Sequence, residues 1–293
     1  MMDSAQSLPV EDLPLLRDSF RRDWPTYAYY YNWAINAIKW RERDPKSAWS
    51  IHCPGGKYDA GAFIATALNG QYIVTVFAFE ESKDKLRKMI TDSNVIDWTR
   101  NVIFGFVHQS FTDVLESAIE EVKVFKNILL SPIMKDTTIN YFKSRDECLK
   151  FEYQVPDNCY LRPLDVSHIP LVNSIWPHRN RENPELSEKY LETFVRLNRS
   201  VGLFLKDDNS LVSWILHADT GSLGQLQTVE GHKRKGYGRI VIQALVRELA
   251  EKESLDSTLF IVKNNAASHK LFNSLGYRPL KEVNWIKVRP SNC

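Results

Sequence analysis

The stretch that decides the fold runs from Gly231 to Arg239 and reads Gly-His-Lys-Arg-Lys-Gly-Tyr-Gly-Arg. It follows a strand expected to end near Val229 and precedes a helix expected over 237–252. Glycines at such a junction let a ligand approach the backbone closely, and the first amides of a helix have no partner inside it. With the helix dipole and the basic side chains, these amides predict a phosphate or pyrophosphate site.

Two common phosphate-binding motifs do not fit this loop. The dinucleotide fingerprint G-x-G-x-x-G needs a third glycine where Val241 stands. A P-loop needs Lys and then Ser or Thr directly after the second glycine of its G-x4-G spacing, but Tyr237 and Gly238 follow Gly236. From the loop alone, a solvated basic turn that begins a helix remains the alternative.

A second segment favours the ligand interpretation. Asn264 to Tyr277 follow the next buried strand, expected over 258–262, and form a helix that ends at Gly276. The two segments together resemble the GCN5-related N-acetyltransferase (GNAT) superfamily, whose pattern is strand, [RQ]-x-x-G-x-[GA], helix, strand, N-x-x-[AS]-x-x-L-Y-x-x-x-G-[FY]. The resemblance covers about residues 226–277. Within it, Thr228 to Gly238 is similar to the two-domain glycine N-acyltransferase-like branch.

The remaining elements can be placed along the chain from periodicity and turn signals. In the first half we expect helices over 11–43 with a break at Pro25, strands at 48–52, 63–68, 72–79 and 102–107, helices at 82–91 and 113–125, and a strand-like 128–130. In the second half we expect strands at 160–163, 201–205, 211–216, up to 229, 258–262 and 285–288, and helices after Asp165 and over 185–197, 237–252 and 266–275. The tightest turn is Asn69-Gly70, where positive φ is expected at both residues.

The two halves share this order of elements, which predicts an α+β fold present twice. The resemblance implies a GNAT-type mixed, mostly antiparallel sheet flanked by helices, with a degenerate N-terminal copy over 1–155 and an intact C-terminal copy over 156–293. The sheet of the intact copy would be splayed between the strands that end at Val229 and Val262. Two unrelated α+β halves are the alternative.

The resemblance implies acetyl-CoA or another acyl-coenzyme A as co-substrate. The amides of residues 234–238 would hold its pyrophosphate, residues 228 and 229 would pair with the pantetheine arm, and residues 265 and 268 would lie beside that arm. The implied coenzyme-binding residues are Thr228, Val229, Lys233, Arg234, Lys235, Gly236, Tyr237, Gly238, Asn265 and Ser268.

The function implied is N-acyl transfer from acyl-coenzyme A to a small amine, with glycine or another amino acid as a candidate acceptor. Some residues depart from the superfamily pattern: Phe272 stands where many members carry a Tyr that protonates the leaving thiolate, and Ser222 stands where glycine-conjugating relatives place an acidic base. Lys233 replaces the usual Arg or Gln. A non-catalytic acyl-coenzyme A sensor or interaction protein is therefore the alternative function.

Three residues are candidates for the general base, which the sequence does not identify: His217, Asp219 and Ser222. By strand alternation His217 and Asp219 would share one face, and an imidazole has a suitable pKa for the task. The alternatives are a surface histidine at a strand end and an aspartate that forms an Asx turn before Gly221.

The first half should not bind coenzyme. At the position equivalent to the phosphate loop it reads Phe79-Glu80-Glu81-Ser82, without glycine and with two carboxylates that would repel a pyrophosphate. Its expected role is to cover the acceptor side of the catalytic half.

Composition sets the remaining expectations. Lys plus Arg number 38 against 36 Asp plus Glu, so no broad basic surface for nucleic acid is expected. Four separated cysteines fit no usual zinc spacing, and no metal is expected. No apolar run is long enough for a membrane span. Acidic residues precede the first basic one, which favours a cytoplasmic location and leaves a mitochondrial one open. Either a monomer or a homodimer is compatible with the sequence.

Overall fold

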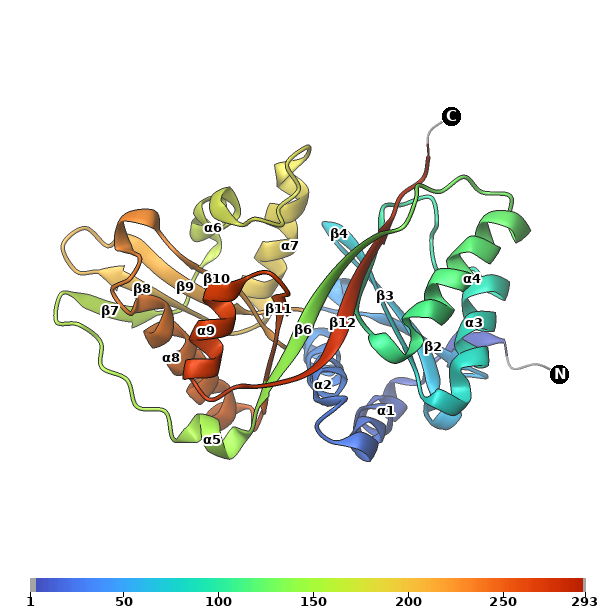
Figure 1. The fold of residues 1–293 in the computed structure, drawn as a ribbon, viewed down its shortest axis with the longest axis horizontal. Coiled ribbons are helices and arrows are strands. Elements are labelled where there is room, and N and C mark those ends of the chain that lie inside the picture. The colour runs from blue at the N-terminus through green and yellow to red at the C-terminus, as the bar shows by residue number, and fades with distance from the viewer. Residues whose placement is uncertain (1–3, 292–293) are drawn as a thin grey trace.

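The computed structural model of the chain describes residues 4–291 and contains one twelve-stranded sheet with helices packed against it (Figure 1). The elements of the first half are β1 (Ala5–Ser7), α1 (Leu13–Ser19), α2 (Ala28–Arg43), β2 (Ser50–Pro54), β3 (Ala62–Asn69), β4 (Gln71–Ala78), α3 (Lys83–Asp92), β5 (Val102–His108), α4 (Thr112–Phe125), β6 (Met134–Lys143) and α5 (Arg145–Leu149). Those of the second are β7 (Cys159–Arg162), α6 (Ile169–Ile175), α7 (Pro184–Leu197), β8 (Ser200–Leu205), β9 (Leu211–His217), β10 (Leu223–Thr228), α8 (Tyr237–Lys252), β11 (Ser257–Val262), α9 (Ala266–Ser274) and β12 (Arg278–Val288).

The sheet confirms the predicted mixed, mostly antiparallel architecture. Its order is β1-β2-β3-β4-β5-β12-β6-β11-β10-β9-β8-β7, and all neighbours are antiparallel except β4 with β5 and β10 with β11. These two parallel pairs occupy equivalent positions in the two halves. In each, the strand that precedes a helix lies beside the strand that follows that helix. The predicted duplication is therefore present in the fold.

The last strands of the two halves are exchanged. The green strand β6 pairs with β11 of the second half, and the red strand β12 pairs with β5 of the first, while β6 and β12 run side by side at the centre (Figure 1). Neither half therefore completes its sheet with its own last strand. The division into 1–155 and 156–293 stays a prediction, and the exchange makes the folding of either part depend on the other.

The hydrophobic core also continues from one half to the other. One buried cluster contains the aromatic side chains of the first half and extends into the second through α7 and through Trp214 on β9. A second cluster lies between α8, α9 and the strands β8 to β11. Because the first cluster spans both halves, α2 and α7 are held in fixed positions around the end of β9.

Aromatic side chains fill the split of the first half. β4 and β5 pair only from Tyr72–Val102 to Val74–Phe104 and then diverge. The hydroxyl of Tyr30 on α2 lies 2.9 Å from the Val76 carbonyl oxygen of β4 and 3.3 Å from the Phe106 carbonyl oxygen of β5. The Tyr30 ring therefore occupies the space between these two strands.

The structure differs from the sequence predictions in three respects. Residues 128–130 do not form a strand, since only Leu130 makes an isolated bridge, to Pro290. The polar stretch after them contains β6 and α5, which the sequence analysis left unassigned. In the β3–β4 hairpin only Gly70 has positive φ, at 82°, because the ladder pairs Asn69 with Gln71 around this single residue.

No helix within residues 4–291 combines the length and the apolar character that a membrane crossing requires.

Candidate active site

β10 and β11 form an open split. They are parallel neighbours, but only Leu223 and Leu259 are in register, so the strands separate toward their C-terminal ends. A bulge interrupts the ladder between β10 and β9: Gly224 and Gln227 have partners on β9, whereas Gln225 and Leu226 have none, and Gln225 has φ of 51°. Such a bulge leaves backbone polar groups free to meet a ligand.

The predicted phosphate loop has accessible backbone at the start of α8. Gly236 is the N-cap residue with φ of 81°, and Arg234 has φ of 61°. The amides of residues 234–238 donate no hydrogen bond to any described residue. A Cβ placed on Gly236 would meet nothing within 4 Å, so the space in front of these amides is open.

The loop side chains differ in what they can offer an anion. Arg234 and Lys235 are exposed. Lys233 forms an exposed ion pair with Glu230, with Nζ and Oε2 2.5 Å apart. The ring of Tyr237 is buried and lies 6.3 Å from the His232 ring. Tyr237 therefore presents only its amide to a ligand at this loop.

Several implied coenzyme residues already have partners. The Val229 amide donates to the Val212 carbonyl at 2.9 Å, and the Val229 carbonyl accepts from His232. The Thr228 hydroxyl lies 2.8 Å from that of Ser213. The side chain of Asn265 accepts a 3.1 Å hydrogen bond from the Ser268 amide and so caps α9. Contacts of these residues with a coenzyme stay predictions.

A cavity of about 1000 Å³ lies where β10 and β11 separate. The first half contributes the tip of the β3–β4 hairpin and the beginning of β5, and the exchanged strands β6 and β12 form another wall. The second half contributes residues 176–190 and the turn between β9 and β10. The Gly70 hairpin tip fits directly against α7, because a Cβ at this position would lie 2.3 Å from the Leu186 carbonyl oxygen.

Asp219 is the buried acid of this cavity. One carboxylate oxygen accepts a 2.8 Å hydrogen bond from the Tyr190 hydroxyl, and the other accepts one of 2.9 Å from the Thr220 amide. Burial raises the pKa of Asp219 to about 6, although both hydrogen bonds act in the opposite direction. A carboxylate with such a pKa can accept a proton near neutral pH.

The turn that carries Asp219 is held from behind by two buried asparagines. Asn36 on α2 donates to the carbonyl oxygens of Asp219 at 2.9 Å and Ala218 at 3.3 Å. Asn198, at the end of α7, donates to the carbonyls of His217 and Ala218. The degenerate half therefore helps to fix the position of the acid. Sequence reasoning missed Asn36 and Tyr190, because neither belongs to a local motif.

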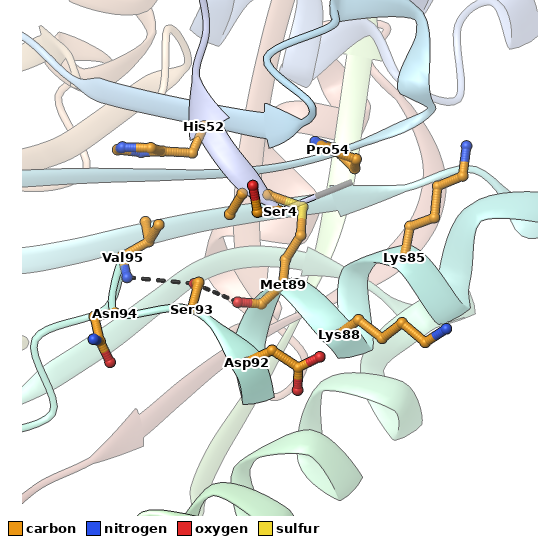
Figure 2. Close-up of a pocket in the computed structure, with 11 residues that line it drawn as sticks. Ser4, His52, Pro54, Lys85, Lys88, Met89, Asp92, Ser93, Asn94 and Val95 are labelled. Atoms are coloured by element: carbon orange, nitrogen blue, oxygen red, sulfur yellow. Dashed lines mark hydrogen bonds between the residues drawn. The ribbon is translucent and has the colours of Figure 1, made fainter. Parts of the chain in front are cut away.

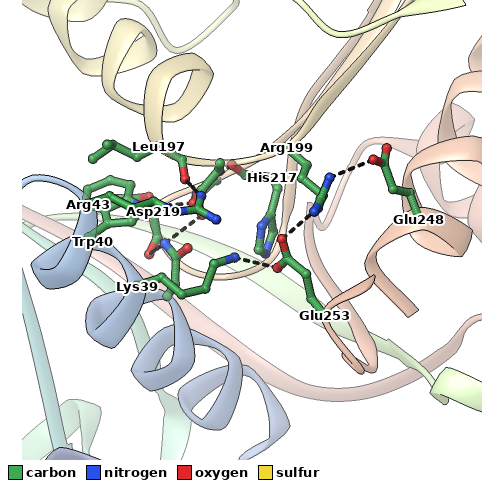
Figure 3. A network of polar contacts seen from close by, with 12 residues as sticks. Lys39, Trp40, Arg43, Leu197, Arg199, His217, Asp219, Glu248 and Glu253 are labelled. Atoms are coloured by element: carbon green, nitrogen blue, oxygen red, sulfur yellow. Dashed lines mark hydrogen bonds and ion pairs between the residues drawn. The ribbon is translucent and has the colours of Figure 1, made fainter. Parts of the chain in front are cut away.

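His217 and Asp219 do not share the cavity, contrary to the alternation argument. β9 ends at His217 and Asp219 lies in the following turn, so the two-residue period no longer applies. His217 is fully buried, and neither ring nitrogen makes a hydrogen bond to a described residue. It lies beside the ion pairs that Glu253 forms with Lys39 and Arg199 (Figure 3). Burial lowers the pKa of His217 to about 4, so the imidazole is neutral at pH 7.

Neither Ser222 nor Phe272 is among the described residues that line the cavity, although Ser222 lies between Thr220 and Leu223, which do. The Ser222 hydroxyl is buried and lies 2.7 Å from the Thr258 hydroxyl. The Phe272 ring is buried in the second core cluster, with its centroid 5.2 Å from that of Tyr277. A proton donor at position 272 would therefore be placed in the core.

The first half has a separate pocket of about 660 Å³ between β1, β2 and α3 (Figure 2). Its lining includes the polar side chains of His52, Lys88 and Asp92 and the apolar side chain of Met89. Within residues 4–291, no group of three or more His, Cys, Asp or Glu side chains is arranged to hold a metal ion.

Two sequence comparisons show which known proteins this chain is similar to. The family profile described as FR47-like protein matches residues 200–286. Human glycine N-acyltransferase-like protein 2 is 28% identical over 214 residues, which cover 71% of this chain and 70% of that protein.

Two solved structures show that the fold extends over both halves. The X-ray structure of a Drosophila protein is 20% identical and matches with a TM-score of 0.85 over 99% of this chain and 100% of that one. A tandem GNAT protein from the clavulanic acid biosynthesis pathway, 11% identical, matches with a TM-score of 0.50 over 99% of both chains. With the loop at 231–239 and the split sheet, these findings support the resemblance given by the sequence: the chain has a GNAT-type fold in both halves and is similar to the glycine N-acyltransferase-like branch.

Proposed function

We propose that the protein transfers an acyl group from acyl-coenzyme A to the nitrogen of a small amine, with Asp219 as the general base. The observation that carries this proposal is the position of a buried carboxylate with a pKa of about 6 in the cavity at the β10–β11 split. The similarity to the glycine N-acyltransferase-like branch, and the name of the human relative, support acyl transfer as the reaction.

The coenzyme would bind along the split of the second half. Its pyrophosphate would accept hydrogen bonds from the amides of residues 234–238, which have no acceptor among the described residues. The side chains of Arg234 and Lys235 would add charge. The acyl thioester would then lie at the bulge of β10, where the unpaired backbone of Gln225 and Leu226 is available to polarise its carbonyl.

The reaction needs no covalent enzyme intermediate. The amine nitrogen attacks the thioester carbonyl, a carbon–nitrogen bond forms, and the amine proton passes to the Asp219 carboxylate and then to solvent. The carbon–sulfur bond breaks, and the thiolate takes a proton from water. Because a thiol is a fairly good leaving group, a protein acid at position 272 is not essential.

The two predicted domains would have different tasks in this scheme. Residues 156–293 would bind the coenzyme, and residues 1–155 would cover the acceptor side. The Tyr30 ring fills the split of the first half, which supports a single coenzyme per chain.

The test is a matrix of acyl-coenzyme A donors against amines, with thiol release and the mass of the amide product as readouts. Amide formation is expected in at least one combination and should be lost in Asp219→Asn. Tight binding of acyl-coenzyme A without amide formation from any amine would favour the sensor function instead.

A further inference from the structure

Cationic side chains dominate the wall of the acceptor cavity. Six Lys or Arg side chains line it, compared with three carboxylates. Two of the six have carboxylate partners: Arg100 pairs with Asp97 at 2.7 Å, and Lys287 pairs with Asp136 at 3.2 Å. The other four form no ion pair with any residue in 4–291, and they are Arg179, Arg181, Lys189 and Arg289.

The cavity's own carboxylates do not neutralise these four cations. Glu182 also lines the cavity without an ion pair among the described residues, and the Asp219 carboxylate accepts hydrogen bonds from Tyr190 and Thr220. Even with both acids ionised, a surplus of positive charge remains. A cavity lined by one sign of charge focuses its field and attracts ligands of the opposite sign.

The coenzyme phosphates do not account for this charge. Their proposed site is the loop 233–238, and no residue of that loop lines the cavity. Three of the four cations belong instead to one stretch, residues 179–189, which includes the beginning of α7. The residue that follows this stretch is Tyr190, whose hydroxyl contacts Asp219. The charge therefore lies on the acceptor side of the proposed base.

We infer that the acceptor is an amine with a net negative charge, carrying two anionic groups, such as a dicarboxylic amino acid or a phosphorylated amine. This inference rests on the proposed function. The amino group would be directed to Asp219, and the anionic groups would contact Arg179, Arg181 and Lys189, with Arg289, the residue after β12, as the fourth cation. Guanidinium groups suit this task because they bind carboxylate or phosphate oxygens in a bidentate manner.

The experiment compares amine acceptors of different charge: glutamate, aspartate, O-phosphoserine, glycine and glycinamide. Wild-type protein should show the highest kcat/KM with one of the dianionic amines, and the comparison of carboxylates with O-phosphoserine identifies the anion. Arg181→Glu combined with Lys189→Glu should raise the KM for that acceptor about tenfold or more. The KM for glycinamide and for the acyl-coenzyme A should stay unchanged.

Lys206→Glu is the matched control, because it makes the same kind of charge change at an exposed position outside the cavity lining. It should leave every KM unchanged. Higher kcat/KM for glycine or glycinamide than for all dianionic amines would overturn the inference and leave the proposed acyl transfer intact. If the coenzyme binds but no amine, in this set or outside it, gives an amide, the proposed function itself is contradicted.

Discussion

The hydroxyl of Tyr190 on α7 donates a 2.8 Å hydrogen bond to the carboxylate of Asp219 in the turn after β9. Both side chains are buried. Burial raises the pKa of Tyr190 well above its usual value, so the phenol keeps its proton and remains a donor. Burial also raises the pKa of Asp219, which means that the charged carboxylate is less favourable in the folded protein than in the unfolded chain.

This relationship predicts that the proposed base destabilises the protein at neutral pH. The pKa of Asp219 rises from 3.8 to about 6 on folding, so the folded state binds more protons between these values. Stability is therefore lost as pH rises from about 4 to 6, by about 3 kcal/mol for this group. Asp219→Asn should unfold at a higher temperature than wild type at pH 8, and the difference should disappear near pH 4. A lower Tm of the variant at pH 8 would show that the charged carboxylate stabilises the fold.

Asn36 is predicted to position the turn that carries Asp219. Asn36→Ala removes the hydrogen bonds to the carbonyls of Asp219 and Ala218 and leaves them without a donor, at a cost of about 1–3 kcal/mol. We expect kcat to fall about tenfold, with an unchanged KM for acyl-coenzyme A, and we expect the pH dependence of kcat to shift.

Asn32→Ala is the matched control for this variant. Asn32 lies on the same helix, but its side chain makes no hydrogen bond to the 217–219 turn. It donates to the Asp256 carbonyl and lies 3.3 Å from the Thr258 hydroxyl. It should lose similar stability while kcat and its pH dependence stay as in wild type. Equal loss of kcat in both variants would mean that Asn36 has only a structural role.

The phosphate loop makes a prediction about coenzyme affinity. Replacing Gly236 and Gly238 by Val places side chains over the amides and strains a residue with φ of 81°. Calorimetry should show one acyl-coenzyme A per wild-type chain and affinity at least tenfold weaker in the double variant. Gly231→Ala is the control, because a Cβ there meets nothing within 4 Å and the residue has no positive φ. Unchanged affinity in the double variant, or two coenzymes per chain, contradicts the assignment.

Phe272→Tyr tests whether position 272 takes part in the chemistry. The ring is in the core against Tyr277, so the added hydroxyl would be buried at a cost of about 1–3 kcal/mol if it finds no partner. We expect a lower Tm, with kcat and coenzyme affinity unchanged. A rise in kcat without loss of stability would place this residue beside the thiol after all.

The sequence predicted those features of the fold that depend on local signals. Gly236 and Gly276 mark the start of α8 and the end of α9, and hydrophobic periodicity located most of the other elements. It did not predict β6, because Lys135, Asp136 and Asn140 interrupt its apolar pattern. This strand is stabilised by pairing with β11 and β12, which are more than 100 residues away. The exchange of β6 and β12 between the halves was not predicted for the same reason, because it also depends on pairing between distant segments.

In the candidate site, too, the sequence predicted only what depends on local signals. The loop at 231–239 was predicted because its glycines and its strand–loop–helix setting are local. Asp219 was one of three candidate bases, and the choice depends on burial and on Tyr190, neither of which is encoded near residue 219. The assumption that His217 and Asp219 share a face was wrong because the strand ends between them.

The most direct test of the account is the ratio of kcat/KM for amide formation between wild type and Asp219→Asn, measured from pH 5 to pH 8. The ratio cancels the ionisation of the amine, which both proteins share. If Asp219 is the base with a pKa of about 6, the ratio should be about 100 or more above pH 7 and should fall about tenfold per pH unit below pH 6. A ratio near one at every pH would contradict the proposed mechanism.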